Sequence, residues 1–126
     1  MRKWSLLSIP YVELHCHSGF SFLDGASHPE ELAVRAAEFG YPALALTDHN
    51  GLYGSMEFAH AARRVNVQPI TGAEVTLRDC FPGVEEPEGG HHVTLLAETP
   101  QGYANLCRLL TEAHMGSERG DTRLAL

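Results

Sequence analysis

The chain has 126 residues, of which 44% are hydrophobic, enough for one domain, or part of one, with a real core. Its 9 Lys and Arg against 16 Asp and Glu give a net charge of -7, which argues against a surface that grips nucleic acid mainly by neutralising phosphates. Divalent cations bound where carboxylates converge would offset part of that charge.

The cysteine pattern and the absence of long apolar runs indicate a cytoplasmic protein. The cysteines are odd in number, widely spaced and without a CxxC pair, which is typical of a reducing compartment: Cys16, Cys80 and Cys107. The basic start at residues 1–3 is followed by too short an apolar stretch for a signal peptide. No apolar run is long enough to span a membrane, so we expect no membrane partner.

From residue 11 onward the hydrophobic pattern predicts strands that alternate with helices, after a lead-in over residues 1–10. The expected strands are Tyr11–His17, Ala43–Thr47, Pro69–Val75 and His92–Ala97. The first expected helix opens at Ser27–Glu30 and stops at Gly40, and the second runs over about Gly54–Val65. The third is capped at Thr99–Pro100 and runs to about His114. Such alternation is typical of an α/β fold with a parallel sheet, open or closed into a barrel. Four strands cannot close a barrel, so either the sheet stays open or the chain is the front part of a longer domain.

Local signals set the expected ends of these elements. Ser27 and Glu30 have the spacing of a capping box, and Gly40 would stop the first helix. The stretch Arg78–Gly90 is rich in Pro, Gly and Glu and reads as an exposed loop or turn. The tail Gly116–Leu126 has no core of its own.

Histidines and acids recur at the ends of the expected strands and in the loops that follow them. On a strand, His15 and His17 share one face, while Cys16 faces the core on the other. Because ligands of α/β folds collect at the carboxyl ends of strands, these side chains are candidates for one site. The candidate metal ligands are His15, His17, Asp24, His49, Glu74 and His92.

This donor set indicates a multi-metal hydrolytic site. Zinc and manganese accept imidazole and carboxylate together, and adjacent ions clamp a phosphoryl group and activate water. Glu74 and Asp48 are the candidate catalytic residues, although Asp48 could instead be a loop cap or an orienter of a neighbouring histidine, and of these two the orienting role is favoured. Asp24 equally suits a turn, and His92 is favoured over His91. Ordinary structural roles are expected for His28, His60 and His114.

The order of motifs resembles a known family, the PHP (polymerase and histidinol phosphatase) domain. The segments that carry the resemblance are HxH, FSFLDG, ALALTDHNGLYG, PITGAEV and HHVTLLAETPQGYANLCRLL, and the match covers about residues 10 to 126. More narrowly, the chain looks like the N-terminus of bacterial C-family DNA polymerases, the DNA polymerase III alpha group. VELHCHSGFSFLDGAS and HNGLYGSMEFAHAAR look closest to its error-prone, DNA-damage-linked branch.

The resemblance implies a distorted (β/α)7 barrel that holds up to three divalent ions (Zn, Mn or Mg) through nine ligands. Carried over to this chain, His15, His17 and Glu74 hold one ion. Glu74 bridges to a second ion held by His92, and Asp24 with His49 holds the third. The last three ligands of the family come from later strands that this chain lacks. On this basis residues 11–126 are a partial domain, truncated after about four strands, that is expected to be inactive alone.

The implied parent is an error-prone DNA polymerase in replication, repair and translesion synthesis. Its PHP domain would be a metal-dependent phosphoesterase or 3′–5′ exonuclease. DNA, bound through the parent, and other replication or mutagenesis proteins are the implied partners. An unfinished barrel would expose the apolar faces of Ala43–Leu46 and Val93–Leu96 and is therefore expected to self-associate. Two alternatives stay open: a non-catalytic module that stabilises the polymerase, and a free-standing phosphatase for a small phosphomonoester.

Overall fold

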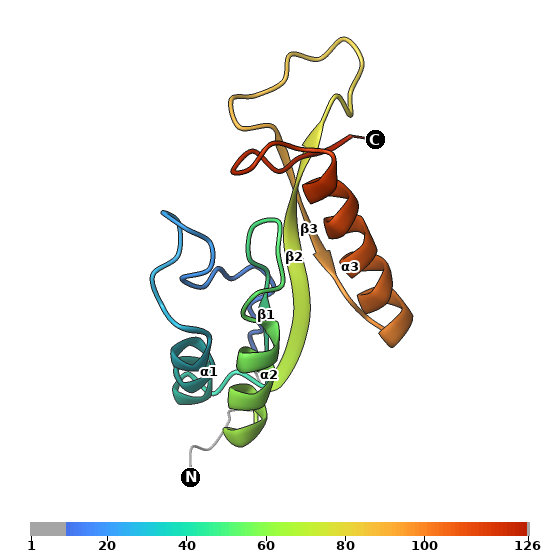
Figure 1. Ribbon diagram of the computed structural model, residues 1–126. Helices are drawn as coiled ribbons and strands as arrows, with labels where there is room; N and C mark the ends of the chain where they lie inside the picture. The colour runs from blue at the N-terminus through green and yellow to red at the C-terminus, as the bar shows by residue number, and fades with distance from the viewer. Residues whose placement is uncertain (1–9, 126) are drawn as a thin grey trace.

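The computed structural model describes residues 10–125, which form a mixed α/β fold. The predicted lead-in lies almost wholly outside the described residues. In Figure 1 a long, curved strand, β2 (Gln68–Arg78), runs through the middle of the molecule. Two helices lie beside one half of β2 and a third lies beside the other half, and the buried apolar residues fall into two small cores.

The first core lies between helices α1 (Pro29–Glu38) and α2 (Ser55–Arg64) and strand β1 (Ala43–Leu46). Its buried members are Ala33, Ala36, Leu44, Leu46, Phe58, Ala61, Ala62 and Val67. The continuous apolar run of β1 is buried as predicted. The expectation that the apolar face of β1 would be exposed in an unfinished barrel is therefore wrong, because α1 and α2 already cover it.

Helix α1 begins one residue later than its capping-box pattern predicted. His28, not Ser27, is the N-cap residue, and its backbone N–H donates to Glu31 Oε2 at 2.8 Å. The reason is Pro29, whose fixed φ suits the first helical position and places the cap on the residue before it. The helix ends as predicted before Gly40, which has a φ of 73°.

The predicted first strand is only partly formed. Its backbone runs parallel to β1. The Ala45 N–H donates to Glu13 O at 2.9 Å, and the Thr47 N–H donates to Cys16 O at 2.8 Å. The backbone N–H of His15, which would continue this ladder, donates instead to the Glu13 side chain at 2.9 Å. A local side-chain acceptor thus competes with regular strand pairing.

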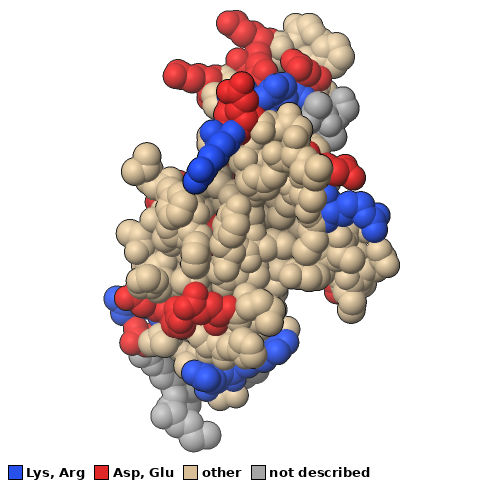
Figure 2. Space-filling view, viewed as in Figure 1, with Lys and Arg blue, Asp and Glu red and all other residues tan. Residues whose placement is uncertain are grey.

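The prediction of a parallel sheet holds for β1 and β2 but is wrong for the next strand. Strand β3 (His91–Leu96) pairs antiparallel with β2, with Glu74 opposite Thr94. The connection over residues 79–90 contains no helix, and parallel strands need a crossover, usually a helical one. This loop carries exposed acidic side chains that gather at the upper end of the molecule in Figure 2.

The second core lies between β2 and helix α3 (Pro100–Met115), which Figure 1 shows beside β2 and β3. Its buried residues are Ala73, Val75, Leu106 and Leu110. Thr99 caps α3 as predicted, because its hydroxyl accepts the Gly102 N–H at 3.0 Å. The tail, which was expected to lack a core of its own, adds a short strand, β4 (Leu124–Ala125), parallel to β2, and Leu124 packs against this core.

Apolar side chains stay exposed on β3, as the unfinished-barrel interpretation expected. Val93 is 39% and Leu96 is 41% exposed. Self-association of the chain stays a prediction. Within residues 10–125, no helix combines the length and the apolar character that a membrane crossing requires.

Close packing at Gly72 generates the first prediction. A Cβ at this position would collide with Leu95 O and lie 2.8 Å from Leu96 Cδ2, where β2 and β3 meet. Gly72→Ala is therefore expected to lower the free energy of unfolding by about 1–3 kcal/mol, measured by urea denaturation. The control is Gly102→Ala, whose Cβ meets nothing closer than 3.4 Å. Equal stability of the two variants would contradict this packing.

Candidate metal centre

The site is built around the carboxylate of Glu74, which is 5% exposed on the long strand β2. Four imidazoles surround it. Glu74 Oε2 contacts the Nε2 atoms of His15 and His17, the latter at 3.3 Å. Glu74 Oε1 lies 3.1 Å from His49 Nδ1 and 2.9 Å from His92 Nδ1. Residues far apart in the sequence therefore converge on one buried acid.

A second carboxylate, that of the exposed Asp24, extends the site from the loop after the HxH segment. Asp24 Oδ2 lies 2.6 Å from His17 Nδ1 and 2.7 Å from His49 Nε2. Both imidazoles thus stand between two carboxylates, with one ring nitrogen toward Asp24 and the other toward Glu74. All six predicted ligand side chains are brought together by the fold.

These side chains form three groups in which the ligand atoms lie within 4.8 Å of one another. The groups are His15, His17 and Glu74; His17, Asp24 and His49; and His49, Glu74 and His92. Neighbouring groups share a member, so the three candidate positions adjoin. Each offers imidazole and carboxylate donors, the combination that zinc and similar borderline ions accept.

The placement of two of these rings between carboxylates supports a metal at the site. A neutral imidazole has one N–H, so a ring between two carboxylates points a lone pair at one of them unless it is protonated or a cation intervenes. Within the described residues, His17 Nε2 is buried and has no hydrogen-bond partner. A buried His17 Nε2 atom that lacks a hydrogen-bond partner and lies 3.3 Å from Glu74 Oε2 suits the role of a metal ligand.

The surroundings of Glu74 and Asp24 lower the pKa of both carboxyl groups. Burial raises the pKa of the Glu74 carboxyl, but the hydrogen bond with His15 and the charges of the neighbouring imidazoles outweigh it, so the pKa lies below its ordinary value. Hydrogen bonds with His49 and His17 lower the pKa of Asp24. Both acids are therefore carboxylates at neutral pH, the form that binds metal.

Cys16 faces away from this centre, as strand alternation predicted. Its side chain packs against the first core beside α1 and α2. Burial raises the pKa of its thiol to about 11. The thiol of this residue is therefore a core group, while the two flanking imidazoles reach Glu74.

Asp48 is buried beside the centre but binds a loop rather than a histidine. Its carboxylate accepts hydrogen bonds from the Ser18 N–H at 2.6 Å and from the hydroxyls of Ser18 and Ser21, each at 2.7 Å. In the described part of the chain, the expected contact that orients a histidine ring is not formed. A catalytic role for Asp48 stays a prediction. What the contacts show is a clamp on the segment between two candidate ligands, His17 and Asp24.

The serines of this clamp were not singled out from the sequence. Ser18 and Ser21 are fully or almost fully buried, and Ser21 Oγ also accepts the backbone N–H of His49 at 3.0 Å. The available signal was the position of Ser18 directly after the HxH motif. The clamp therefore positions His17, Asp24 and His49 through the backbone.

The turn after β1 is joined to the middle of β2 at the site by backbone hydrogen bonds. The Glu74 N–H donates to Asp48 O at 3.0 Å, and the Asn50 N–H donates to Glu74 O at 2.8 Å. His92 arrives from β3, opposite Thr76, and its ring faces Glu74, whereas the centroid of the His91 ring lies 5.1 Å from that of Phe81.

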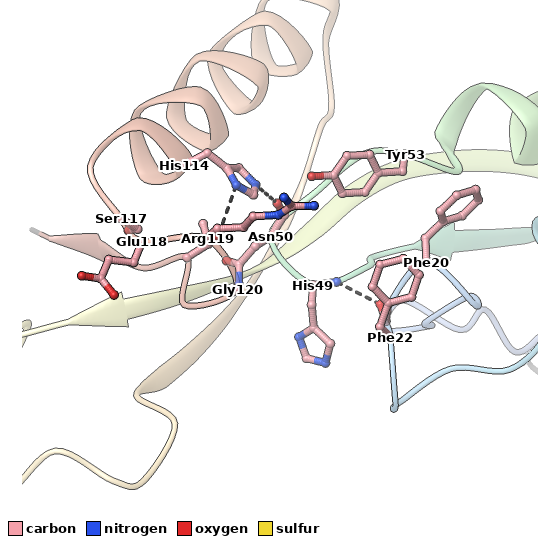
Figure 3. Close-up of a pocket in the computed structure, with 12 residues that line it drawn as sticks. Phe20, Phe22, His49, Asn50, Tyr53, His114, Ser117, Glu118, Arg119 and Gly120 are labelled. Atoms are coloured by element: carbon pink, nitrogen blue, oxygen red, sulfur yellow. Dashed lines mark hydrogen bonds between the residues drawn. The ribbon is translucent and has the colours of Figure 1, made fainter.

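Beside the centre lies a pocket of about 850 Å³ that sequence reasoning missed. In Figure 3, Phe20 and Phe22 lie at one side, His114 and Arg119 at the other, and Tyr53 between them. His114, expected to be structural, contacts Asn50 O through Nε2 at 2.6 Å. The signal that could have pointed to the pocket was the FSF run beside Asp24.

The comparisons agree with this combination of fold and metal centre. Residues 13–125 match the family model of the PHP domain. The chain therefore belongs to the PHP domain family. It matches the N-terminal region of bacterial error-prone DNA polymerases. One such relative, from Symbiobacterium thermophilum, is 54% identical over 108 residues, which cover 86% of the chain and 9% of that protein.

Two solved structures share the fold. An amidohydrolase from Chromobacterium violaceum, with bound sulfate and no metal, is 33% identical with a TM-score of 0.63, covering 83% of this chain and 34% of that one. A two-domain protein from Bacteroides vulgatus, described as containing a predicted PHP-like metal-dependent phosphoesterase, is 19% identical with a TM-score of 0.54, covering 80% and 32%. The second likeness bears on the fold alone.

Removal of the ligands generates the second prediction. Because Glu74 belongs to two ligand groups and His15 to one, Glu74→Ala should lose more bound divalent metal than His15→Ala, each weakening affinity by at least about tenfold. Elemental analysis after dialysis against zinc or manganese would measure this. The matched control is His60→Ala, an exposed histidine outside all three groups. Metal content in both ligand variants equal to that of the control would refute the assignment.

Disruption of the serine clamp generates the third prediction. Asp48→Asn replaces a buried acceptor of three hydrogen bonds by a group that presents N–H donors to Ser18 or Ser21. The free energy of unfolding should fall by about 2–3 kcal/mol in urea denaturation. Glu38→Gln, the same change on an exposed acid paired only with Arg35, should cost less than about 1 kcal/mol. If Asp48→Asn cost no more than this control, the clamp would contribute nothing.

Proposed function

We propose that this chain supplies the front part of a distorted seven-stranded β/α barrel whose metal centre hydrolyses phosphodiester bonds. In this proposal His15, His17 and Glu74 hold one ion, and Glu74 is shared with a second ion beside His92. Asp24 and His49 contribute to a third. Zinc, manganese and magnesium are the candidate ions, with zinc and manganese favoured by the number of imidazoles.

The observation that carries the proposal is the position of Glu74 between two ligand groups. A carboxylate with one oxygen toward His15 and His17 and the other toward His49 and His92 is arranged to bridge two ions. Bridged ions at short separation are the arrangement used for in-line displacement at phosphorus. When bound, such ions polarise the phosphoryl oxygens and lower the pKa of an attacking water.

The side chains of the chain itself would hold this arrangement rigid. The low pKa of Glu74 and Asp24 keeps both acids charged, so they are ligands rather than proton donors at neutral pH. The Asp48 clamp fixes the loop that carries Asp24 and the backbone of His49. As a bridging ligand, Glu74 has no free oxygen for proton transfer, so its catalytic role would be electrostatic.

The activity of the whole protein is also part of the proposal. The chain spans 9% of the length of the Symbiobacterium relative, whose name is error-prone DNA polymerase. We infer that the parent protein is a DNA-directed DNA polymerase of the cytoplasm that acts on damaged DNA with other replication or mutagenesis proteins. The PHP domain would then remove nucleotides from a 3′ end.

A second candidate function is a structural one. The metal ligands join the segment before α1, the end of β1, and strands β2 and β3, which otherwise belong to two separate small cores. Ions at the centre would therefore fasten the two halves of the fold. A free-standing phosphatase is less well supported, since the 54% identical relative is a polymerase.

The fourth prediction tests hydrolysis. The protein as its gene encodes it should shorten a 5′-labelled single-stranded oligonucleotide from its 3′ end in manganese or zinc. Glu74→Gln should reduce the rate at least about a hundredfold, because a bridging anion is lost. His60→Ala is the control. Metal-dependent stability without any shortening by the wild-type protein would favour the structural module instead.

A further inference from the structure

The pocket beside the metal centre is formed by the loop that also carries Asp24, by the turn after β1, and by the segment that follows α3. Its volume of about 850 Å³ lies in the range of small-ligand pockets. His49 joins the two sites: its imidazole belongs to two ligand groups and, in Figure 3, points away from the other labelled side chains. A molecule in this pocket would adjoin the ions.

Aromatic rings make up much of the wall. Phe20 and Tyr53 lie with ring centroids 6.3 Å apart and planes at 32°. Phe22 is 84% and Tyr53 is 62% exposed, so each presents a ring face to solvent at the pocket. What sets these two rings apart from other exposed aromatic residues of the chain is that they line a pocket beside the candidate metal centre, and exposed rings are the surfaces on which unstacked bases stack.

Arg119 adds a positive charge to the pocket, which is the sign that a phosphate requires. In Figure 3 the guanidinium of Arg119 extends toward the Tyr53 hydroxyl and His114. Among the ion pairs found within residues 10–125, Arg119 takes part in none. It is therefore available to an anionic group such as a phosphate.

The net charge of the chain limits the ways in which it can bind a nucleic acid. With a net charge of -7, the chain cannot hold a long polyanion by phosphate neutralisation. The face shown in Figure 2 has scattered basic side chains and no continuous basic track. Stacking of one or two bases, with a single phosphate at Arg119, needs no such track.

We propose that this pocket is a base-binding subsite that takes the unstacked terminal nucleotide of a single polynucleotide strand. The base stacks on Phe22 and Tyr53, Arg119 receives a phosphate, and the adjoining phosphodiester reaches the metal centre past His49. The inference rests on the proposed phosphodiesterase function and sets its substrate class: a strand end with a base, rather than a small phosphomonoester without one.

The test compares the affinities of the full-length protein for two probes in the presence of manganese. The first is a fluorescent hexathymidylate with hydrolysis-resistant phosphorothioate linkages near its 3′ end. The second is the same oligonucleotide with abasic residues at its last two positions, so the phosphates are equal and only the bases differ. Fluorescence anisotropy should show roughly five- to hundredfold tighter binding of the first probe.

Variants locate the preference. Phe22→Ala and Tyr53→Ala, both at exposed positions, should bring the affinities for the two probes together, and Arg119→Gln should weaken both probes alike. Phe39→Ala removes an exposed aromatic ring on the far end of α1 and should keep the full preference. Equal binding of both probes by the wild-type protein would overturn the subsite. An unchanged preference in Phe22→Ala and Tyr53→Ala would overturn it too.

A separate readout keeps this inference apart from the function on which it rests. Cleavage of an unmodified abasic-ended oligonucleotide, followed in the same variants, reports on the metal centre without the bases. Cleavage with no base preference refutes the subsite and leaves the phosphodiesterase intact. Base preference in binding without any cleavage supports the subsite and refutes the proposed hydrolysis.

Discussion

The structure depends on one buried negative charge. Glu74 lies at 5% exposure in the middle of the longest strand, and an isolated carboxylate there would be costly. The compensation comes from four imidazoles, which arrive from the segment before α1, the turn after β1, and β3. The requirement to neutralise this acid therefore brings together chain segments that the hydrophobic cores leave separate. A metal ion held by these donors would therefore couple metal binding to folding.

A second buried acid, Asp48, has a different role from Glu74. Asp48 and Glu74 are neighbours across parallel backbones, joined by the Glu74 N–H to Asp48 O bond of 3.0 Å. Asp48 is satisfied by serine hydroxyls and a backbone N–H, which need no metal, so it shapes the loop. Glu74 is satisfied by imidazoles that each retain a second nitrogen, so it shapes the ion site. The surroundings, not the residue type, separate the two roles.

Local patterns predicted what local physics determines. The run Ala43–Leu46, the Thr99 cap and the shared face of His15 and His17 follow from periodicity and from local capping. Glu74, expected at the end of a strand, lies instead in the middle of β2 and still meets both imidazoles. The weak pairing of the first segment depends on a side chain that takes the His15 N–H, and the partners of Asp48 depend on how a loop closes. Neither of these contacts produces a periodic pattern in the sequence. The pocket also went unpredicted, because its walls come from segments that only the tertiary fold brings together.

The antiparallel direction of β3 shows how far one topological detail determines the site. In the observed register Glu74 is opposite Thr94 and Thr76 is opposite His92. Side chains two apart share a face, so His92 lies diagonally beside Glu74 on the same face, while His91 is on the other. A slip of one residue would exchange the two histidines. The doublet was therefore ambiguous until the hairpin over residues 79–90 fixed the pairing, and the same pairing brings His92 Nδ1 to 2.9 Å from the Glu74 carboxylate.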